Sequence, residues 1–273
     1  GRRPEARDNG TSVGERESET GNIPSSPGPR PLAPSLRAVP LPDAARLNTI
    51  PVSGPRRIIA ERVTYSATTA PHLTVTLRVD MTEAVRLRER LLEPMQHRTG
   101  HRLSYSVIFA RAVADCLQRH PFLNASLDGE SIVQWADVNL GIAMDLGDSL
   151  IVPVIRRAQG KSLAQLTIEM SDLIERARQK KLGPAQMTGS TFTISNLGMC
   201  NIEHFTAIIN PPESAILAIG KIVDTAVHQG GRVVFRPLIS LTLSADHRVV
   251  DGATAARFLA DLQSVVENPY LLL

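Results

Sequence analysis

Hydrophobic positions recur at two periods within residues 51–273, and these periods predict helices and strands. In residues 73–79, Leu and Val alternate with Thr and Arg, which is the period of a half-buried strand. In residues 163–177, apolar side chains recur every three or four positions and predict an amphipathic helix. A capping box formed by Ser162 with the glutamine three residues later begins that helix, and the Gly-Pro pair at residues 183–184 ends it.

The same two periods give the order of the remaining elements. Ser53 is expected to cap the first helix, and an Asp-Glu capping signal is expected to begin the second. Helices are expected at residues 54–66, 81–92, 104–119 and 252–267, the second ended by Pro94. Strands are expected at residues 137–144, 150–156, 191–195, 214–220, 222–228 and 232–244, with Gly230 and Gly231 joining the last two as a hairpin. Helices that alternate with strands and hairpins favour a mixed α/β fold, with a largely antiparallel sheet and flanking helices.

The first 50 residues have a different composition. They contain eight of the 19 prolines, interleaved with mixed charges and with little periodicity. Such a segment cannot bury enough apolar surface to offset the entropy lost on ordering it. We therefore expect a flexible proline-rich linker over residues 1–50 and one folded domain over residues 51–273.

Composition narrows the class of this domain. The chain has 30 Lys plus Arg against 27 Asp plus Glu and only 4% aromatic residues, a balance that disfavours a nucleic-acid target. No apolar run reaches the roughly 20 residues that a membrane span requires. Cys116 and Cys200 lie in apolar surroundings outside any C-x-x-C arrangement, which favours a reducing compartment.

The first candidate for chemistry is SADHRVVDGATAARF, residues 244–258. His247 follows a predicted strand, so a rigid element holds it, and an imidazole ordinarily titrates near neutral pH, as a general base requires. Asp251 stands at the N-cap position of the next helix, where its carboxylate can accept backbone N–H groups or face an external cation. Taken alone, the pair also fits a structural histidine beside a capping aspartate.

A second candidate lies in GSTFTISNLG, residues 189–198. Phe192 and Ile194 alternate into the core, so Thr193 and Ser195 face the other way. Ser195 then ends the strand as a hydroxyl donor. A serine in this position is more often a turn former, and these residues alone leave both interpretations open.

Two other patterns carry less weight. GDSL at residues 147–150 matches the nucleophile motif of a lipase and esterase family. That family follows the motif with D-x-x-H, whereas this chain has H-x-x-x-D, so we interpret Ser149 as part of a turn. A metal site at His247 and Asp251 would need a third ligand, and no His or Cys cluster supplies one. The chain also has no Walker loop and no G-x-G-x-x-G.

Together these motifs resemble a known family. SADHRVVDGATAARF is similar to the D-H-R-x-x-D-G signature of the dihydrolipoamide acyltransferases, the core components of the 2-oxo acid dehydrogenase complexes. Other blocks resemble that family in its own order: SGPRRIIAERV, TAPHLTVTLRVDMT, HPFLNAS, VNLGIAM, LIVPVI, GSTFTISNLG and INPPESAILAIG. The stretch SNLGMCNIEHFTAIINPPESAILAIG is most similar to acetyl-transferring members of pyruvate dehydrogenase complexes. The chain resembles only the catalytic domain and a linker, because a lipoyl-lysine D-K-A motif is absent and a subunit-binding module is missing or reduced to RPLAPSLRAV.

The resemblance implies acetyl transfer from an S-acetyl-dihydrolipoyl group to coenzyme A. His247 would take the proton of the coenzyme A thiol, and Ser195 would donate a hydrogen bond to the oxyanion of a tetrahedral intermediate. Asp251 would hold the loop of His247 in place by pairing with Arg57 or Arg62. Lipoate would be carried on a lipoyl domain outside this chain, coenzyme A is the co-substrate, and no metal is implied.

By the same resemblance, the fold is that of chloramphenicol acetyltransferase, and the active site lies between subunits of a homotrimer. Asn196 would contact substrate. The other histidines are interpreted as structural or surface residues, and for His72 alone a contact with substrate is kept as an alternative. The C-terminal NPYLLL would join trimers into a cubic or icosahedral cage, which would work with lipoyl domains, a 2-oxo acid decarboxylase and dihydrolipoamide dehydrogenase. The expected setting is the bacterial cytoplasm or the mitochondrial matrix.

Two alternatives stay open within this resemblance. One is a branched-chain or other acyl specificity, and the other is a drug-modifying acetyltransferase of the same fold that uses the same histidine. Noncatalytic relatives lose that histidine, and this chain retains His247, which argues against a purely structural subunit.

Overall fold

A computed structural model describes residues 47–147 and 150–273, together with residues 1 and 45. The chain divides into two units, Gly1–Leu47 and Asn48–Leu273, and every element described below belongs to the second. The linker expected over residues 1–50 lies almost wholly outside the described residues, and so does Ser149. Both interpretations stay predictions.

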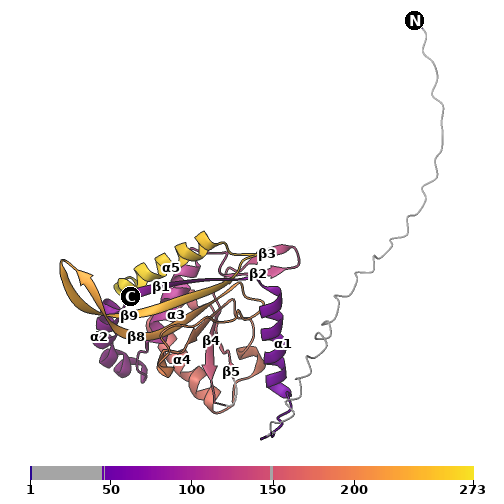
Figure 1. The fold of residues 1–273 in the computed structure, drawn as a ribbon, viewed down its shortest axis with the longest axis horizontal. Coiled ribbons are helices and arrows are strands. Elements are labelled where there is room, and N and C mark those ends of the chain that lie inside the picture. Colours follow the sequence, from indigo (N-terminus) through magenta and orange to yellow (C-terminus); the bar gives the residue numbers. More distant parts are fainter. Residues whose placement is uncertain (2–44, 46, 148–149) are drawn as a thin grey trace. The chain divides into compact units, whose positions relative to one another are not determined.

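The described residues of the second unit form a seven-stranded mixed sheet (Figure 1). Its strands are β1 (His72–Asp80), β4 (Leu140–Asp145), β5 (Leu150–Ile151), β6 (Val154–Ile155), β7 (Phe192–Asn196), β8 (Ala215–Gln229) and β9 (Arg232–Asp246). The order is β1-β9-β8-β7-β4-β5, and β6 also pairs with β4. β7 is parallel to β4 and β8, and the other pairs of this sheet are antiparallel, which confirms a mixed and largely antiparallel fold.

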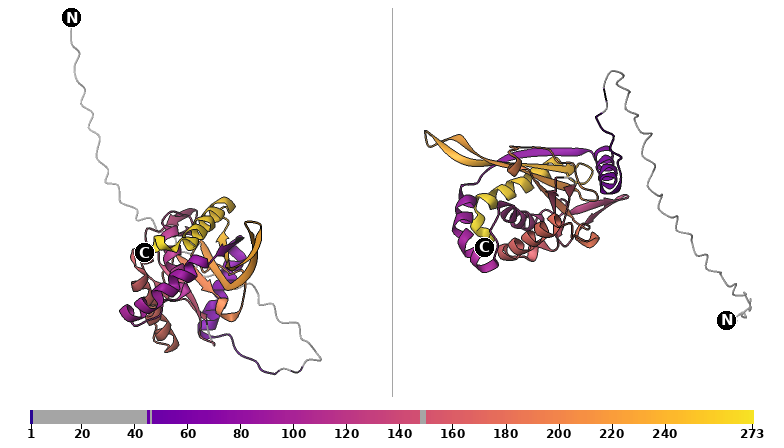
Figure 2. Two further views of the ribbon diagram at one scale, coloured as in Figure 1. Left: turned by 90° about the vertical axis from the view of Figure 1, so that its left-hand side faces the viewer. Right: turned by 90° about the horizontal axis from the view of Figure 1, so that it is seen from below.

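Helices flank this sheet as expected. The helices α2 (Thr82–Thr99), α3 (Tyr105–Leu117), α4 (Leu163–Arg178) and α5 (Gly252–Glu267) lie on one face of the sheet (Figure 2). A further helix, α1 (Gly54–Thr69), lies apart from these, near the end of the sheet where β5 is (Figure 1). Short 3₁₀ turns occur at Ala158–Gly160, Pro184–Gln186, Gly198–Cys200 and Pro269–Leu272. None of the described helices is both long and apolar enough to cross a membrane.

Alternation along the strands divides the two faces of the sheet as predicted. Phe192 and Ile194 of β7 belong to the core that the four helices cover, whereas Thr193 and Ser195 do not. The odd-numbered apolar residues over 73–79 of β1 and 239–245 of β9 point to the same core. The face of the sheet opposite the helices is therefore where Ser195 is available for chemistry.

Local signals confirm several predicted element ends. Ser162 caps α4 through the expected capping box, and the predicted apolar stripe of α4 is buried. Gly230 and Gly231 both have positive φ, which suits the tight hairpin between β8 and β9. Ser53 does occupy the N-cap position of α1, but its side chain makes no capping hydrogen bond.

The predicted end of the second helix at Pro94 is wrong, because α2 continues to Thr99 and stops at Gly100 in the left-handed conformation. Proline in a helix interior removes one backbone hydrogen bond at a cost of about 3 kcal/mol. Pro94 lies on the exposed side of α2, where water can satisfy the freed carbonyl, and Met95 beside it is buried in the core. Tertiary packing therefore extends this helix past the proline.

Two strand predictions also need correction, and one hairpin was missed. The expected strand over residues 150–156 is interrupted at Pro153 into β5 and β6. The two strands expected over residues 214–228 are one continuous strand, β8, with a register shift between Ile219 and Ile222. A separate hairpin of β2 (Ala125–Asp128) and β3 (Ser131–Gln134) was not predicted, since four-residue strands carry too little periodicity to identify.

Candidate active site

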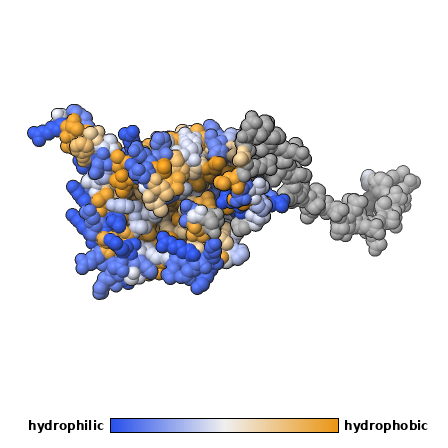
Figure 3. Space-filling view, turned by 60° about the horizontal axis from the view of Figure 1, so that its bottom comes forward, coloured by the Kyte–Doolittle hydropathy of each residue, from blue (hydrophilic) through white to orange (hydrophobic). Residues whose placement is uncertain are grey.

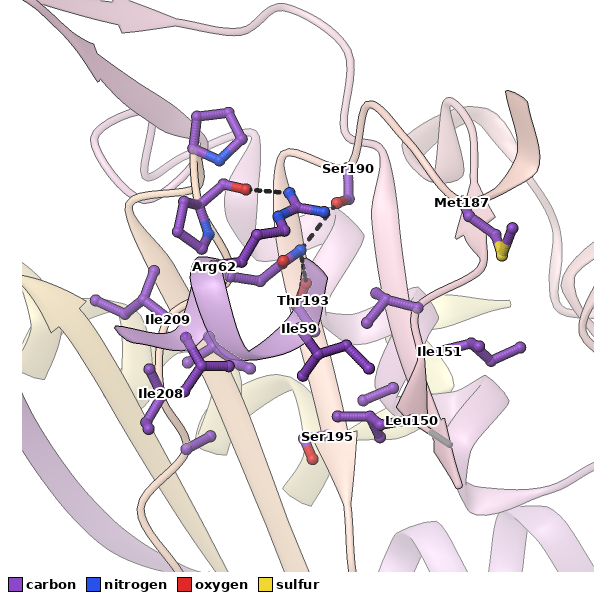
Figure 4. Close-up of a pocket in the computed structure, with 18 of the residues that line it drawn as sticks. Ile59, Arg62, Leu150, Ile151, Met187, Ser190, Thr193, Ser195, Ile208 and Ile209 are labelled. Carbon is purple, nitrogen blue, oxygen red and sulfur yellow. Dashed lines mark hydrogen bonds between the residues drawn. The ribbon is translucent and has the colours of Figure 1, made fainter. Parts of the chain in front are cut away.

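A cavity of about 740 Å³ lies over the face of the sheet that the four helices leave open. Thr193 and Ser195 of β7 and Ile216 of β8 contribute to it from the sheet. α1, β5 and the segments 187–190 and 205–212 surround them (Figure 4). Most lining side chains are aliphatic, so the cavity suits a long and weakly polar substrate arm.

Ser195 is placed in this cavity by its neighbours in the sheet. Its strand partners are Ala143 of β4 and Ala218 of β8, and two methyl side chains leave the hydroxyl uncovered. Ser195 is half-buried, and its Oγ has no hydrogen-bond partner among the described residues. The hydroxyl is therefore available to donate to a substrate oxygen.

The turn that follows β7 is built on close backbone packing. The Asn196 Oδ1 accepts a hydrogen bond from the Gly198 N–H at 2.9 Å. A Cβ at Gly198 would lie 2.5 Å from the Gly220 carbonyl oxygen, so only glycine fits there. Asn196 also donates from Nδ2 to Ser106 Oγ at 3.3 Å, and it does not line the cavity. Its predicted contact with substrate rests on the resemblance alone.

His247 lies in the turn directly after β9. Its backbone N–H donates to the Pro71 carbonyl oxygen at 2.9 Å, which fixes the turn against the start of β1. On either side of it in sequence, Asp246 and Arg248 form a two-point ion pair, with Nε to Oδ1 at 3.0 Å and Nη2 to Oδ2 at 2.6 Å. The His247 side chain is exposed and has no hydrogen-bond partner within the described residues. Its backbone is thus fixed while its ring faces outward.

Asp251 caps α5 as predicted, accepting the Thr254 N–H at 2.6 Å. That hydrogen bond lowers the pKa of the Asp251 carboxyl below its usual value. The expected ion pair with an arginine of the first helix is not formed within one chain. Arg57 pairs with Glu61, and Arg62 donates to the Pro211 carbonyl oxygen.

Both ring nitrogens of His72 have partners within the chain, in keeping with the structural interpretation, and its alternative role as a substrate contact stays a prediction. Nδ1 lies 2.8 Å from the Ala70 carbonyl oxygen, and Nε2 accepts the Ile209 N–H at 3.2 Å. His72 does not line the cavity. It is therefore part of the framework around the cavity.

Ser195 and His247 do not meet within one chain. Ser195 is level with Ala218 of β8, which is level with Thr242 of β9. His247 lies five residues beyond Thr242, which is roughly 17 Å along the strand at about 3.4 Å per residue. The cavity that contains Ser195 is not lined by His247. A single chain thus holds the two candidate catalytic groups at separate places.

Comparison with known proteins identifies this architecture. The family model for the 2-oxoacid dehydrogenases acyltransferase (catalytic domain) matches residues 44–273. The chain belongs to this family. The match covers the whole second unit, including every strand and helix described above.

Two curated relatives illustrate the match. The dihydrolipoyllysine-residue acetyltransferase component of the acetoin cleaving system of Bacillus subtilis is 40% identical over 82% of this chain and 56% of its own length. The corresponding component of the mitochondrial pyruvate dehydrogenase complex of Schizosaccharomyces pombe is 42% identical over 81% of this chain and 46% of its own. The chain thus spans about half the length of the curated relatives it matches.

Two solved structures share the fold. The cubic core of a pyruvate dehydrogenase multienzyme complex is 34% identical, with a TM-score of 0.83, and the match covers 88% of this chain and 99% of that one. The dihydrolipoamide acetyltransferase of Azotobacter vinelandii is 35% identical with the same TM-score and coverage. That structure comes from a study of the roles of a serine, a histidine and an asparagine in its catalytic mechanism.

Sequence reasoning missed one carboxyl group in this acyltransferase domain. Glu213 is buried, and its Oε1 accepts hydrogen bonds from Ser190 Oγ, Thr193 Oγ1 and Asn210 Nδ2 at 2.5, 2.8 and 2.7 Å. Burial raises the pKa of the Glu213 carboxyl to about 7, although these three donors and the nearby Arg62 act in the opposite direction. These three donors line the cavity, so the hydrogen bonds to Glu213 hold the polar residues of the cavity wall in place. The available signal was a glutamate directly before the apolar run SAILAIG.

No group of three or more His, Cys, Asp or Glu residues in the described parts of the chain could hold a metal ion. Of the two cysteines, Cys116 is buried and Cys200 is exposed. Burial raises the pKa of the Cys116 thiol to about 12, so Cys116 is unsuited to act as a nucleophile.

Proposed function

We propose that this domain transfers an acetyl group between a dihydrolipoyl thiol and the thiol of coenzyme A at a site shared by two copies of the chain. Ser195 of one copy and His247 of a neighbouring copy complete each site. The observation that carries this proposal is the separation of the two groups. Ser195 lines the cavity, His247 does not line it, and His247 lies exposed in the turn after β9.

The Azotobacter vinelandii enzyme supports this choice of residues. The serine, histidine and asparagine named for its mechanism have the same separations along the chain as Ser195, His247 and Asp251. This agreement in spacing supports the proposal that Ser195 and His247 take part in the reaction. It also indicates that the position of Asp251 does not require a negative charge, since that enzyme has an asparagine there.

His247 acts as the general base. A thiol with a pKa of about 8.5 is mostly protonated at neutral pH, and the thiolate is the nucleophile. A ring nitrogen of His247 takes the proton of the coenzyme A thiol as the sulfur attacks the acetyl carbonyl carbon. When the bond between that carbon and the dihydrolipoyl sulfur breaks, the leaving thiolate takes the proton back. Such proton transfer typically contributes 10²- to 10⁴-fold to rate.

Ser195 stabilises the oxyanion. As the carbonyl carbon becomes tetrahedral, negative charge gathers on its oxygen, and the unpaired Ser195 hydroxyl donates a hydrogen bond to it. The flanking alanines keep that hydroxyl open to the cavity. Both thiols are substrates, so the chain supplies a base, a donor and a binding cavity and needs no resident cofactor for this step. The lipoyl group would arrive on a lipoyl domain outside the matched region.

Assembly follows from the need for a second copy. Figure 3 shows hydrophobic and hydrophilic surface gathered in different areas of one face. Ile58, Val63 and Tyr65 of α1 are among the exposed large apolar side chains, and they suit burial against a neighbouring subunit. We propose a homotrimer with three such sites. Trimers would join into a cubic or icosahedral cage in the bacterial cytoplasm or mitochondrial matrix, served by a 2-oxo acid decarboxylase and dihydrolipoamide dehydrogenase.

The C-terminal leucines do not act alike in this proposal. Leu272 is buried in the core of its own chain, whereas Leu271 and Leu273 are 76% and 74% exposed. The expectation that all three leucines serve the cage contact is therefore revised to two. Replacing Leu271 and Leu273 by serine should leave active trimers that do not form the large particle.

The direct test is acetyl transfer from acetyl-CoA to dihydrolipoamide, with succinyl-CoA and isobutyryl-CoA in parallel. We expect the acetyl group to be transferred fastest and the isolated monomer to be inactive. Chloramphenicol as the acceptor tests the drug-modifying alternative. Absence of transfer to dihydrolipoamide by assembled protein, with every acyl donor, would overturn the proposal.

A further inference from the structure

His72 is held in one chemical form by its two contacts. The Ala70 carbonyl oxygen near Nδ1 can only accept a hydrogen bond, and the Ile209 N–H near Nε2 can only donate one. A neutral ring with its proton on Nδ1 satisfies both contacts. No other state does so, because a ring protonated on both nitrogens would direct Nε2–H at the Ile209 N–H.

The Ile209 end of this contact belongs to the cavity wall. Residues 205–212 line the cavity and contain no helix or strand, so other groups must hold them in place. Ser66 Oγ donates to the Ile209 carbonyl oxygen at 2.7 Å, and His72 accepts from the Ile209 N–H. Ile209 is 3% exposed, so both of its backbone groups would lose a partner without these side chains.

The His72 end of this contact lies next to the backbone that holds His247. Pro71, the residue before His72, accepts the His247 N–H through its carbonyl oxygen. His72 itself is paired in register with Asp246 of β9. Residues 70–72 therefore contact the turn of the base on one side and the wall of the cavity on the other.

We propose that His72 is a positioning residue for acetyl transfer, which fixes the cavity wall at Ile209 against the segment that holds His247. This proposal rests on the proposed function. If each site combines two chains, a single chain supplies its His247 to one site and its cavity to another site. His72 of that chain then connects these two parts. His72 thus acts through the framework and does not touch substrate.

The test compares His72→Phe with His72→Gln. Phenylalanine fills a similar volume but makes neither hydrogen bond, whereas the glutamine amide oxygen can accept the Ile209 N–H near the place of Nε2. His97→Gln on the exposed side of α2 is the matched control. Two quantities are measured: the rate of hydrogen exchange at the Ile209 amide, and kcat and KM for acetyl transfer to dihydrolipoamide.

We expect His72→Phe to speed exchange at Ile209 by at least about 10-fold and to lower kcat by about 10-fold or more, with a smaller change in KM. His72→Gln should keep Ile209 protected and retain most of the turnover, and His97→Gln should change neither quantity. If His72→Phe does not fold, Ser66→Ala removes the other side-chain bond to Ile209, and it should raise exchange there and lower kcat in the same direction.

Three results would overturn the assignment. Faster exchange at Ile209 with unchanged kcat would mean that the position of the cavity wall at Ile209 does not affect catalysis. A loss confined to KM would make His72 a substrate contact. A loss of turnover in His72→Gln with Ile209 still protected would give the ring a direct chemical role. If the unmodified protein transfers no acetyl group, the proposed function fails, whereas exchange at Ile209 still reports on the contact itself.

Discussion

Ser195 lies in the sheet and His247 lies directly after one of its strands, and the two residues have opposite environments. Ser195 lies within β7, with strands on both sides and a cavity above it. His247 lies beyond the end of β9, in an exposed turn anchored through its backbone. The carboxyl groups nearby differ in the same way, since burial raises the pKa of Glu213 and a hydrogen bond from Thr254 lowers that of exposed Asp251.

Under the proposed function, this difference indicates which half of the site each region would supply. The region around Ser195 offers a hydroxyl donor in a mostly aliphatic cavity, and a developing oxyanion requires such a donor. The region around His247 offers a base on a fixed backbone but no enclosure. Neither half suffices, and a trimer that places one against the other would supply both. The predictions below test this division, from the largest expected effect to the smallest.

Replacing His247 by alanine should have the largest effect on turnover. We expect kcat to fall by at least about 100-fold, because the general base is removed. Folding and assembly should be unchanged, since the exposed ring contributes nothing to the core. Steady-state kinetics and light scattering would check this, and near-normal turnover in an intact particle would remove His247 from the mechanism.

Replacing Ser195 by alanine should lower kcat by about 100-fold while changing KM much less. The hydrogen bond to the oxyanion strengthens only as negative charge forms, so its loss is felt in the transition state. Kinetics over a range of dihydrolipoamide concentrations separate the two parameters. A rise in KM at constant kcat would instead make Ser195 a substrate-binding residue.

Mixing the two variants tests whether the site is shared. Each site would take Ser195 from one chain and His247 from the next, so trimers refolded from an equal mixture of Ser195→Ala and His247→Ala chains should regain about a quarter of the normal activity. Mixing the two preformed assemblies without subunit exchange is the control. Activity that stays at the level of the single variants would place both groups of a site in one chain.

Glu213→Gln should change the pH dependence of stability. Folding raises the pKa of Glu213 from 4.5 to about 7, so the stability that its bound proton contributes is complete below pH 4.5 and is lost as pH rises through about 7. The effect is on the order of 3 kcal/mol. Chemical denaturation at several pH values should show this slope in the unmodified protein and a flatter one in the variant. Equal slopes would mean that Glu213 does not titrate in this range.

Asp251→Ala should have the smallest effect, a fall of a few degrees in the unfolding temperature through loss of the α5 cap. Asp251→Asn is the matched variant, because asparagine also caps helices, and it should stay close to the unmodified protein. The pKa of Asp251 is lower in the folded protein than its ordinary value of 3.8. Its negative charge therefore stabilises the fold at pH values above 3.8, and this stabilisation is lost as pH falls through the lower pKa of the folded state. Thermal unfolding at neutral and acid pH checks both statements.

Much of the local structure could be predicted from residue patterns. The alternation around Phe192 placed Ser195 on the open face, and the capping signals at Ser162 and Asp251 marked two helix starts, because these features depend on neighbours within a few positions. The signature around His247 also identified the family before any contact was known. Pro94 shows the limit, since core packing outweighed a local helix-breaking signal.

The sequence by itself determined the hydrophobic periods of the helices and strands, the helix caps and the family signature. Each of these depends on residues that are close together along the chain. Only the tertiary structure decided that Glu213 is buried next to the cavity and that both ring nitrogens of His72 have partners within the chain. It also decided that Ser195 and His247 lie apart within one chain. The Nε2 contact of His72 joins residues 137 apart, the hydrogen bonds of Glu213 join residues up to 23 apart, and the separation of Ser195 from His247 follows from strand order. Local propensity does not encode them, because burial and distance arise only when the whole sheet has formed.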